Sequence, residues 1–295
     1  MDFLFSVFTP TYNRANTIGR TYEYLCKQTL RSFEWIIVDD GSTDNTEEIV
    51  QKWINTNKIS IVYLKQENGG KHRAFNRAVQ IAKGEIFICL DSDDYYIETA
   101  LEIIYSYHLI HKDNPWIAGF SCNSLDLHGN LIGTSLPVDE LVVSHYNLYN
   151  SLSVKGDKGL IYYTRILKEY PFPEFENEFF VTEALVLNRI SLRYKICCIK
   201  RSLEIKDYQR DGLSSKYRHL CLRNPNGYAL YINERNYFNL SFTNYVINAA
   251  SYVRYSLFAG KSFRNIYKEA INRRWTFIIA CFLGILLYIK DKSRS

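Results

Sequence analysis

Residues 86–96 read IFICLDSDDYY, an apolar run that ends in three closely spaced carboxylates, Asp91, Asp93 and Asp94. A short apolar run that follows a Gly-Glu pair is typical of a buried strand. Carboxylates crowded at the end of a strand repel one another unless a cation lies among them. The stretch therefore favours a divalent metal site, and a solvated acidic turn is the simpler alternative.

The kind of metal follows from the ligands. Oxygen-only ligands favour Mg²⁺ or Mn²⁺, and Mg²⁺ commonly binds one or two carboxylates together with water and substrate phosphates. A nucleoside diphosphate is thus a natural partner. A calcium loop of the EF-hand type is a rival, because Asp91, Asp93 and Glu102 fall at its first, third and twelfth positions. It fails at the sixth position, where Tyr96 replaces the required glycine.

The composition is that of a globular protein with one large domain, or one domain with an appendage. The chain has 295 residues, of which 47% are hydrophobic and 23% are charged. Its seven cysteines lack paired spacing, which predicts free thiols in a reducing compartment and neither a disulfide framework nor a zinc site. The first residues, MDFLFSVFTP, predict a strand and not a signal peptide, because no basic segment precedes the apolar run.

Strand and helix patterns alternate over the first hundred residues. Strand patterns cover residues 3–9, 34–38, 59–64 and the run that begins at residue 86, and helical spacing follows each of the first three. Asp44 is the expected N-cap of the second helix. This alternation predicts a mostly parallel, doubly wound α/β sheet, in which ligands bind beyond the carboxyl ends of the strands. The loop with Thr11 and Asn13, the pair Asp39 and Asp40, and residues 91–94 should therefore converge.

The pattern changes after a helix expected over residues 97–112. Residues 116–125 and 131–134 predict a hairpin around a turn at 126–130, and the middle of the chain is expected to be mixed α+β. The apolar stretch 179–190 predicts a helix that carries one acid, Glu183. Such a carboxylate either faces solvent or is held in a cleft for chemistry, and composition alone favours the solvent-exposed position.

The C-terminal region is basic and apolar. From Arg254 onward, nine Lys and Arg residues stand against two acids, so this region carries more than the whole formal net charge of +5. The uninterrupted run 275–289 would reach only ~22 Å as a helix, which is short of a ~30 Å hydrocarbon core. Residues 252–267 interleave aromatic and basic side chains, which suits a helix at an anionic membrane surface. The alternative is a core helix packed on the main domain, and nucleic-acid binding is not expected because no reader motif is present.

Four motifs together resemble the family 2 glycosyltransferases of the GT-A fold, of the bacterial surface-polysaccharide type. They are PTYNR at 10–14, VDDGSTD at 38–44, ENGGKHRAFNRAVQIAKGE at 67–85 and LDSDD at 90–94. Their order at the ends of successive βα units makes the resemblance specific. It covers residues 3–125 strongly and 155–164, 179–190 and 207–214 more loosely.

The resemblance implies a division of the chain. It implies a Rossmann-like GT-A domain over residues 1–227, with a nucleotide-sugar half at 1–125 and an acceptor half at 126–227. A helical, membrane-associated region would occupy residues 228–295.

The resemblance also implies roles in binding the donor. Thr11, Tyr12 and Arg14 resemble the pocket for the base, where Asp39 would accept the imide N–H of uracil and favour a UDP-sugar. Residues 68–71 resemble the loop near the nucleotide. In that loop the glycines let the backbone approach the ligand and Lys71 offsets phosphate charge. The remaining implied donor residues are Asn68, Gly69, Gly70, Arg73, Asn76, Asp91 and Ser92.

The implied chemistry needs a metal and a base. Asp93 resembles the direct metal ligand, Asp91 is shared between ribose and metal, and Asp94 orients them or helps the acceptor. Glu183 matches the general base that deprotonates the acceptor, although many relatives have Glu-Asp where Ala184 follows here. Asp157 is the other candidate for the base or for an acceptor contact. His72 is expected to be a hydrogen-bonding or packing residue.

We therefore expect an inverting glycosyltransferase that depends on Mn²⁺ or Mg²⁺. It would transfer a sugar from a UDP-sugar to a glycan or lipid-linked acceptor in surface polysaccharide biosynthesis. The protein would be cytoplasmic and peripheral on the inner face of the cell membrane, with no nucleic-acid partner. The alternatives are a nucleotidyltransferase and a catalytically inactive binding module for a sugar nucleotide or a glycan.

Overall fold

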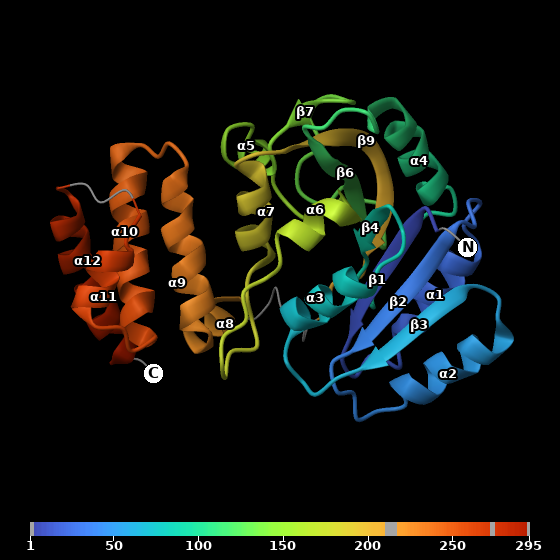
Figure 1. Ribbon diagram of the computed structural model, residues 1–295, viewed down its shortest axis with the longest axis horizontal. Helices are drawn as coiled ribbons and strands as arrows, with labels where there is room; N and C mark the ends of the chain where they lie inside the picture. The colour runs from blue at the N-terminus through green and yellow to red at the C-terminus, as the bar shows by residue number, and fades with distance from the viewer. Residues whose placement is uncertain (1–2, 210–216, 272–274, 294–295) are drawn as a thin grey trace. The chain divides into compact units, whose positions relative to one another are not determined.

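The computed structural model describes residues 3–209, 217–271 and 275–293, and much of the chain forms one nine-stranded sheet (Figure 1). The main path of the sheet has the order β3-β2-β1-β4-β8-β6-β9-β5, and β7 pairs with β9. The strands are β1 (Phe5–Thr11), β2 (Phe33–Asp39), β3 (Ser60–Lys65), β4 (Ile86–Cys89), β5 (Tyr95–Tyr96), β6 (Ile117–Asp126), β7 (Val142–Val143), β8 (Lys158–Tyr163) and β9 (Lys195–Lys206).

The first four strands form the predicted parallel half of the sheet. Strand β1 pairs in parallel with β2 and β4, and β2 pairs in parallel with β3. Every residue of β2 is buried, as expected for an apolar strand that is covered on both faces. The rest of the sheet is mixed, because β8 runs antiparallel to β4 and β6 while β9 runs parallel to β6. The predicted α/β class is confirmed.

Helices cover both faces of the parallel half. On one face Tyr22 stacks on Trp53 with ring centroids 4.3 Å apart, and both lie over Trp35 of β2. On the other face Phe75 packs edge-on against Phe8 of β1 at 5.6 Å. The helices of this region are α1 (Ile18–Cys26), α2 (Thr46–Thr56), α3 (Lys71–Ile81), α4 (Ala100–His111), α5 (His145–Asn150) and α6 (Thr164–Glu169).

Two predicted elements differ in the structure. The hairpin expected over residues 116–134 is limited to the residues beside its turn, where Leu125 forms an antiparallel bridge with Leu131. Along most of its length β6 takes β8 and β9 as partners instead. The turn itself is present, since the Asp126 carboxylate accepts hydrogen bonds from the N–H groups of His128 and Asn130. The helix expected over residues 179–190 is α7 (Glu183–Ser191), which begins at Glu183.

The chain divides into two compact units. One holds Met1–Pro171 and Leu187–Arg210, and the other holds Phe172–Val186 and Asp211–Ser295. This division differs from the boundary expected after residue 227, because residues 172–186 belong with the C-terminal helices. The physical link is the buried carboxylate of Glu178, which accepts hydrogen bonds from the backbone N–H groups of Asn226 and Gly227.

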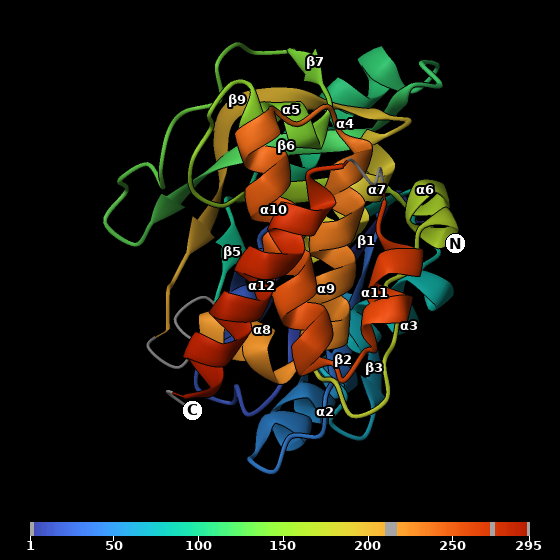
Figure 2. The same cartoon turned by 90° about the vertical axis from the view of Figure 1, so that its left-hand side faces the viewer.

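The second unit is helical, and Figure 2 shows α12 crossing in front of α10. Its core contains Ala249, Ala250, Val253 and Ala280. Gly284 lets the two helices approach closely, because a Cβ atom there would lie 2.6 Å from the Ala250 carbonyl oxygen. Its elements are α8 (Tyr217–Arg223), α9 (Pro225–Glu234), the 3₁₀ helix η2 (Arg235–Tyr237), α10 (Phe242–Phe258), α11 (Phe263–Glu269) and α12 (Phe277–Lys292).

The prediction of a single surface helix over residues 252–267 is wrong. Helix α10 ends at Phe258, Gly260 follows with φ 72°, and α11 begins only at Phe263. Tyr252 and Tyr255 lie in the core of the helical unit and do not face a membrane. Among the described residues, no helix is both long enough and apolar enough to cross a bilayer.

The buried carboxylate of Asp40 joins two loops at the carboxyl end of the sheet. One of its oxygens accepts hydrogen bonds from Gln66 Nε2 at 2.6 Å and Gly69 N at 2.8 Å. The other accepts one from Gly70 N at 2.8 Å. Gly41 allows this contact, because it has φ 88° and a Cβ atom there would lie 3.1 Å from Asn68 N. The turn after β2 therefore fixes the loop that leads into α3.

Replacing Asp40 tests this connection. In Asp40→Asn the amide group cannot accept hydrogen bonds at both oxygen positions, so a buried N–H loses its partner. We expect the free energy of unfolding to fall by about 1–3 kcal/mol in urea titrations, together with faster hydrogen exchange at Gly69 and Gly70. The control Asp113→Asn changes an exposed carboxylate and should stay within about 0.5 kcal/mol. Equal stability of the two variants would contradict this role of Asp40.

Candidate functional site

The polar residues singled out in the sequence gather at one edge of the sheet. Thr11 and Asp39 are direct partners at the ends of β1 and β2. Asp91 comes two residues after β4, which runs parallel to β1. Strand β8 runs antiparallel to β4 with Leu160 opposite Cys89, so Asp157 precedes β8 at this same edge. The predicted convergence of the strand ends is therefore present in the structure.

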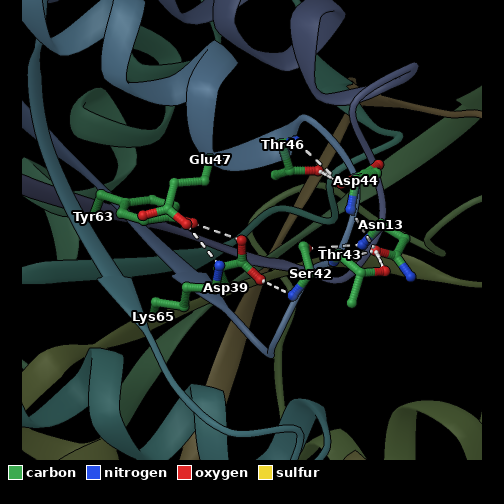
Figure 3. A network of polar contacts seen from close by, with 9 residues as sticks. All are labelled: Asn13, Asp39, Ser42, Thr43, Asp44, Thr46, Glu47, Tyr63 and Lys65. Atoms are coloured by element: carbon green, nitrogen blue, oxygen red, sulfur yellow. Dashed lines mark hydrogen bonds and ion pairs between the residues drawn. The ribbon is translucent and has the colours of Figure 1, made fainter.

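Asn13 joins the loop after β1 to the loop after β2 (Figure 3). Its side-chain oxygen accepts hydrogen bonds from the N–H of Thr43 at 2.8 Å and of Asp44 at 3.3 Å. Its own N–H donates to Ser42 Oγ at 2.9 Å. Asn13 has φ 53°, a conformation that asparagine tolerates better than most residues. The two loops thus form one wall of the site.

Asp44 contributes to the same wall, although it is not the helix cap that we expected. The N-cap of α2 is Asn45, and the Asp44 carboxylate accepts hydrogen bonds from Thr46 N at 3.1 Å and Ala15 N at 3.1 Å. Although partial burial raises the pKa of Asp44, these hydrogen bonds hold it below its usual value. Asp44 therefore links the start of α2 to the first loop.

Asp39 is completely buried beneath this wall (Figure 3). One carboxylate oxygen accepts a hydrogen bond from Ser42 N at 2.6 Å, and the other accepts one from the Tyr63 hydroxyl at 2.6 Å. Burial, together with this hydrogen bond to Asp39, raises the pKa of Tyr63 and keeps the hydroxyl protonated as a donor. Each Asp39 oxygen retains a further lone pair for a ligand. We did not identify Tyr63 from the sequence, where it is one aromatic residue in an ordinary strand.

Three residues expected in the nucleotide pocket lie at the end of β1 and in the loop after it, and Thr11 is paired with Asp39. Thr11 is buried, and its hydroxyl has no hydrogen-bond partner among the described residues, which is expected of a polar group that awaits a ligand. Tyr12 is 48% exposed. Arg14 lies close enough to Asp91 and Asp93 for its positive charge to favour their ionised forms.

Asp91 and Asp93, which follow β4, differ in their surroundings. Asp91 Oδ1 lies 2.6 Å from Lys71 Nζ, and the Asp91 side chain is 35% exposed. Burial tends to raise the pKa of Asp91, but the charges of Lys71 and Lys206 outweigh it and leave the pKa below its usual value. Burial and the negative charge of Asp91 raise the pKa of Asp93. Ser92 is buried between them.

Asp94 holds strand β9 in place, unlike Asp91 and Asp93. Its carboxylate accepts hydrogen bonds from Lys206 Nζ at 2.8 Å and from the N–H of Asp207 at 3.0 Å. The Lys206 ammonium also lies 3.3 Å from a carboxylate oxygen of Glu204. Both oxygens of Asp94 are thus engaged by β9 and the residue after it. No local pattern indicates this contact, because 112 positions separate the two side chains.

The residues fit a divalent metal that is shared with a ligand. No group of three His, Cys, Asp or Glu side chains in the described part of the chain is arranged to hold a metal ion by itself. Asp91 and Asp93 remain partly exposed, whereas Asp94 is buried and is held by Lys206 and the N–H of Asp207. Two carboxylates are a donor set that suits Mg²⁺ or Mn²⁺ when water and a diphosphate complete the coordination.

The loop at residues 68–71, which was expected near the nucleotide, is held in place by the turn after β2. Asn68 Nδ2 donates to the Asp40 carbonyl at 3.0 Å, and Gly70 has φ 92° immediately before α3. Lys71 is the first residue of α3, where the backbone N–H groups of a helix attract negative charge. His72 is buried. Lys71 and the N-terminus of α3 therefore present positive potential beside Asp91.

The two candidate bases lie in different units. Asp157 is exposed, and one of its carboxylate oxygens accepts a hydrogen bond from the Tyr208 hydroxyl at 2.8 Å. It belongs to the unit that holds Asp91 and Asp93. Glu183 is half-buried at the start of α7 and belongs to the helical unit. The role of each as a base remains a prediction.

Known proteins resemble this chain both in sequence and in fold. It is 35% identical over 149 residues to the glycosyltransferase GlyG of Streptococcus pneumoniae, a match that covers 48% of each protein. It is 32% identical over 200 residues to the poly(ribitol-phosphate) β-N-acetylglucosaminyltransferase TarS of Staphylococcus aureus, covering 64% of this chain and 34% of TarS. The chain thus spans less than half the length of either relative.

Two solved structures share the fold. A structure of residues 1–349 of S. aureus TarS with UDP-GlcNAc superposes with a TM-score of 0.62 at 20% identity, covering 98% of this chain and 91% of that one. The mannosyltransferase PcManGT of Pyrobaculum calidifontis with GDP-Man and Mn²⁺ gives 0.56 at 15% identity, covering 98% and 88%.

The match to a family model lies in the N-terminal part of the chain, which carries the site. Residues 6–125 match the family model "Glycosyl transferase family 2". This range contains β1 to β4, the loops joined by Asp40 and Asn13, and the carboxylates Asp91 and Asp93. Residues 6–125 therefore have the sequence of glycosyl transferase family 2, and the chain is similar to bacterial glycosyltransferases such as GlyG and TarS.

Proposed function

We propose that this protein is an inverting, metal-dependent glycosyltransferase that moves a sugar from a UDP-sugar to a hydroxyl of a surface-polymer acceptor. The observation that carries the proposal is the convergence of the Thr11–Asp39 pair and the Asp91–Asp93 pair at one edge of the sheet. Thr11 and Asp39 offer polar groups to the nucleotide base, and Asp91 and Asp93 offer carboxylates to a metal and a ribose. The match of residues 6–125 to family 2 supports the same reaction class.

The choice of UDP rests on Asp39. A buried carboxylate with a free lone pair on each oxygen matches the imide N–H of uracil, which is a donor. The TarS structure that shares this fold contains UDP-GlcNAc, and PcManGT contains GDP-Man, so the fold accommodates both bases. Thr11, Tyr12 and Arg14 would line the remainder of the pocket. Asn68, Gly70, Lys71 and Ser92 would lie along the ribose and diphosphate.

The proposed chemistry follows from where charge develops. Asp91 and Asp93 would hold Mn²⁺ or Mg²⁺, which acts as a Lewis acid on the departing diphosphate. Lys71 offsets further negative charge on that leaving group. Inversion requires the acceptor hydroxyl to attack the anomeric carbon from the face opposite the diphosphate, and a carboxylate must take its proton. Glu183 is the proposed base, with Asp157 as the alternative.

The proposed acceptor is a glycan or a lipid-linked saccharide. GlyG and TarS are named as glycosyltransferases, and TarS acts on poly(ribitol-phosphate). A lipid-linked acceptor would place the protein on the inner face of the cell membrane as a peripheral protein. The exposed apolar residues of α12 support that location.

Substitutions at the metal site and at the base test the reaction. Asp93→Ala should abolish Mn²⁺-dependent turnover of UDP-GlcNAc and related UDP-sugars, because one of two metal ligands is lost. Glu183→Gln should bind UDP normally but lower kcat by about 10²–10⁴-fold, the usual contribution of a general base. Release of UDP and transfer to a saccharide acceptor would be measured together, with Asp113→Asn as the control.

Two outcomes would change this assignment. Normal turnover by Glu183→Gln, together with loss of activity in Asp157→Asn, would make Asp157 the base. Metal-dependent turnover by Asp93→Ala at the rate of the unmodified protein would contradict the proposed metal site.

A further inference from the structure

Helix α12 exposes a continuous apolar face. Its exposed side chains recur at intervals of three and four residues, so they lie along one side of the helix. The opposite side is buried, where Ala280 and Gly284 pack toward α10. The exposed apolar residues are Trp275, Ile278, Ile279, Phe282, Leu283, Leu286 and Ile289, with exposed fractions between 43% and 76%. Soluble proteins rarely leave an apolar patch of this extent uncovered.

Basic residues accompany this face. Lys290 is exposed one turn beyond Leu286, on the same side of α12. On α11 the exposed aromatic residues Phe263 and Tyr267 are each followed by an exposed basic residue, Arg264 and Lys268. Apolar and aromatic side chains next to Lys and Arg are typical of helices that lie in a membrane interface.

The acidic residues of α10 to α12 are neutralised within the helical unit. The sequence has two acids from Phe242 to Lys292, Glu269 and Asp291. Lys261 lies 2.7 Å from a carboxylate oxygen of Glu269, and Arg254 forms an ion pair with Asp291. The surface therefore has a positive charge that a second copy of the same surface would repel. Anionic lipid headgroups would complement it.

We propose that the exposed face of α12, together with α11, binds the surface of an anionic membrane with the axis of α12 parallel to the bilayer plane. Sixteen residues of helix reach only about 24 Å, too short to span the bilayer but long enough to lie in the interface. The apolar side chains enter the acyl boundary, and the Lys and Arg side chains extend to the headgroups. This binding rests on the helical surface and does not require the proposed transferase reaction.

Vesicle flotation tests the surface. The whole protein should float with vesicles of phosphatidylcholine containing 30% phosphatidylglycerol, and much less with phosphatidylcholine alone or at 1 M salt. The variant Ile278→Ser with Phe282→Ser should bind at least tenfold more weakly, because it removes two of the most exposed apolar side chains. The control Leu109→Ser with Ile110→Ser removes two exposed apolar side chains of α4 and should bind like the unmodified protein.

Several results would overturn this proposal. One is failure of the unmodified protein to bind anionic vesicles, and another is equal loss of binding in the two double variants. A dimer that the α12 variant alone converts to monomer would show that a second copy covers the face. UDP binding by the α12 variant provides a check on its fold and keeps a failure of membrane binding distinct from a failure of the proposed reaction.

A second, independent observation concerns Lys71, whose ammonium lies 2.6 Å from Asp91 Oδ1. A metal ion bound to Asp91 would share this carboxylate with Lys71, and two cations on one carboxylate repel each other. A diphosphate would change this balance, because its negative charge attracts both cations. We infer that Lys71 weakens metal binding until the donor arrives and thereby couples the two ligands. This inference rests on the proposed donor site.

Calorimetric titration of Mn²⁺ tests the coupling without any turnover. In Lys71→Met, Mn²⁺ should bind at least tenfold more tightly than in the unmodified protein when UDP is absent, whereas UDP should bind more weakly at saturating Mn²⁺. Lys71→Arg keeps the charge and should keep the weak Mn²⁺ binding. The control Lys52→Met removes an exposed charge on α2 and should change neither titration.

The direction of the change in Mn²⁺ affinity decides the outcome. Binding of Mn²⁺ to Lys71→Met that is equal to or weaker than binding to the unmodified protein would overturn the inference. A lack of UDP-sugar turnover in the unmodified protein would instead contradict the proposed function, and it would leave the Mn²⁺ titrations interpretable.

Discussion

Negative charge crowded at the carboxyl end of β4 is the constraint on which the site depends. Burial and the charge of Asp91 raise the pKa of Asp93, and burial with the charges of Glu204 and Asp91 raises the pKa of Asp94. Uncompensated carboxylates in such a place are costly. Lys206 stabilises Asp94 and Glu204 from β9, and Lys71 stabilises Asp91 from α3. Lys71 and Lys206 lie far apart in the sequence of this unit, so the fold must be complete before the carboxylates can be held together. The arrangement leaves Asp91 and Asp93 partly exposed.

The loops around these carboxylates are held mostly by hydrogen bonds from backbone N–H groups to polar side chains, and not by large apolar residues. Asp40 and Asn13 each accept hydrogen bonds from the N–H groups of a neighbouring loop, and Asp39 is held by Ser42 and Tyr63. Such contacts fix the loops to the sheet while their outer surfaces remain free for a ligand. The helical unit is held together by apolar packing. One side of α12 packs on α10, and the other side is apolar and exposed.

The sequence predicts the parallel half of the sheet well, because strands and helices alternate there and each strand is a continuous apolar run. It also places Asp39, Asp91 and Asp93 at converging strand ends, since carboxylates at strand ends are conspicuous, and their roles in binding stay predictions. It does not reveal Tyr63 or Lys206, whose partners are distant in the chain. Residues 252–267 were misinterpreted because the apolar pattern runs across the break at Gly260. The pairing of β6 with β9 was missed because strand partners far apart leave no local pattern.

The most direct test of the account is a thermal-shift measurement with UDP and with GDP, each with and without Mn²⁺. Ligands that bind only the folded protein raise its apparent stability. The account predicts that UDP with Mn²⁺ raises the melting temperature most, that UDP alone raises it less, and that Asp93→Ala removes the effect of Mn²⁺. A larger shift with GDP would contradict the role of Asp39 in selecting uracil. Absence of a shift with either nucleotide would contradict the central claim that this edge of the sheet binds a nucleotide sugar.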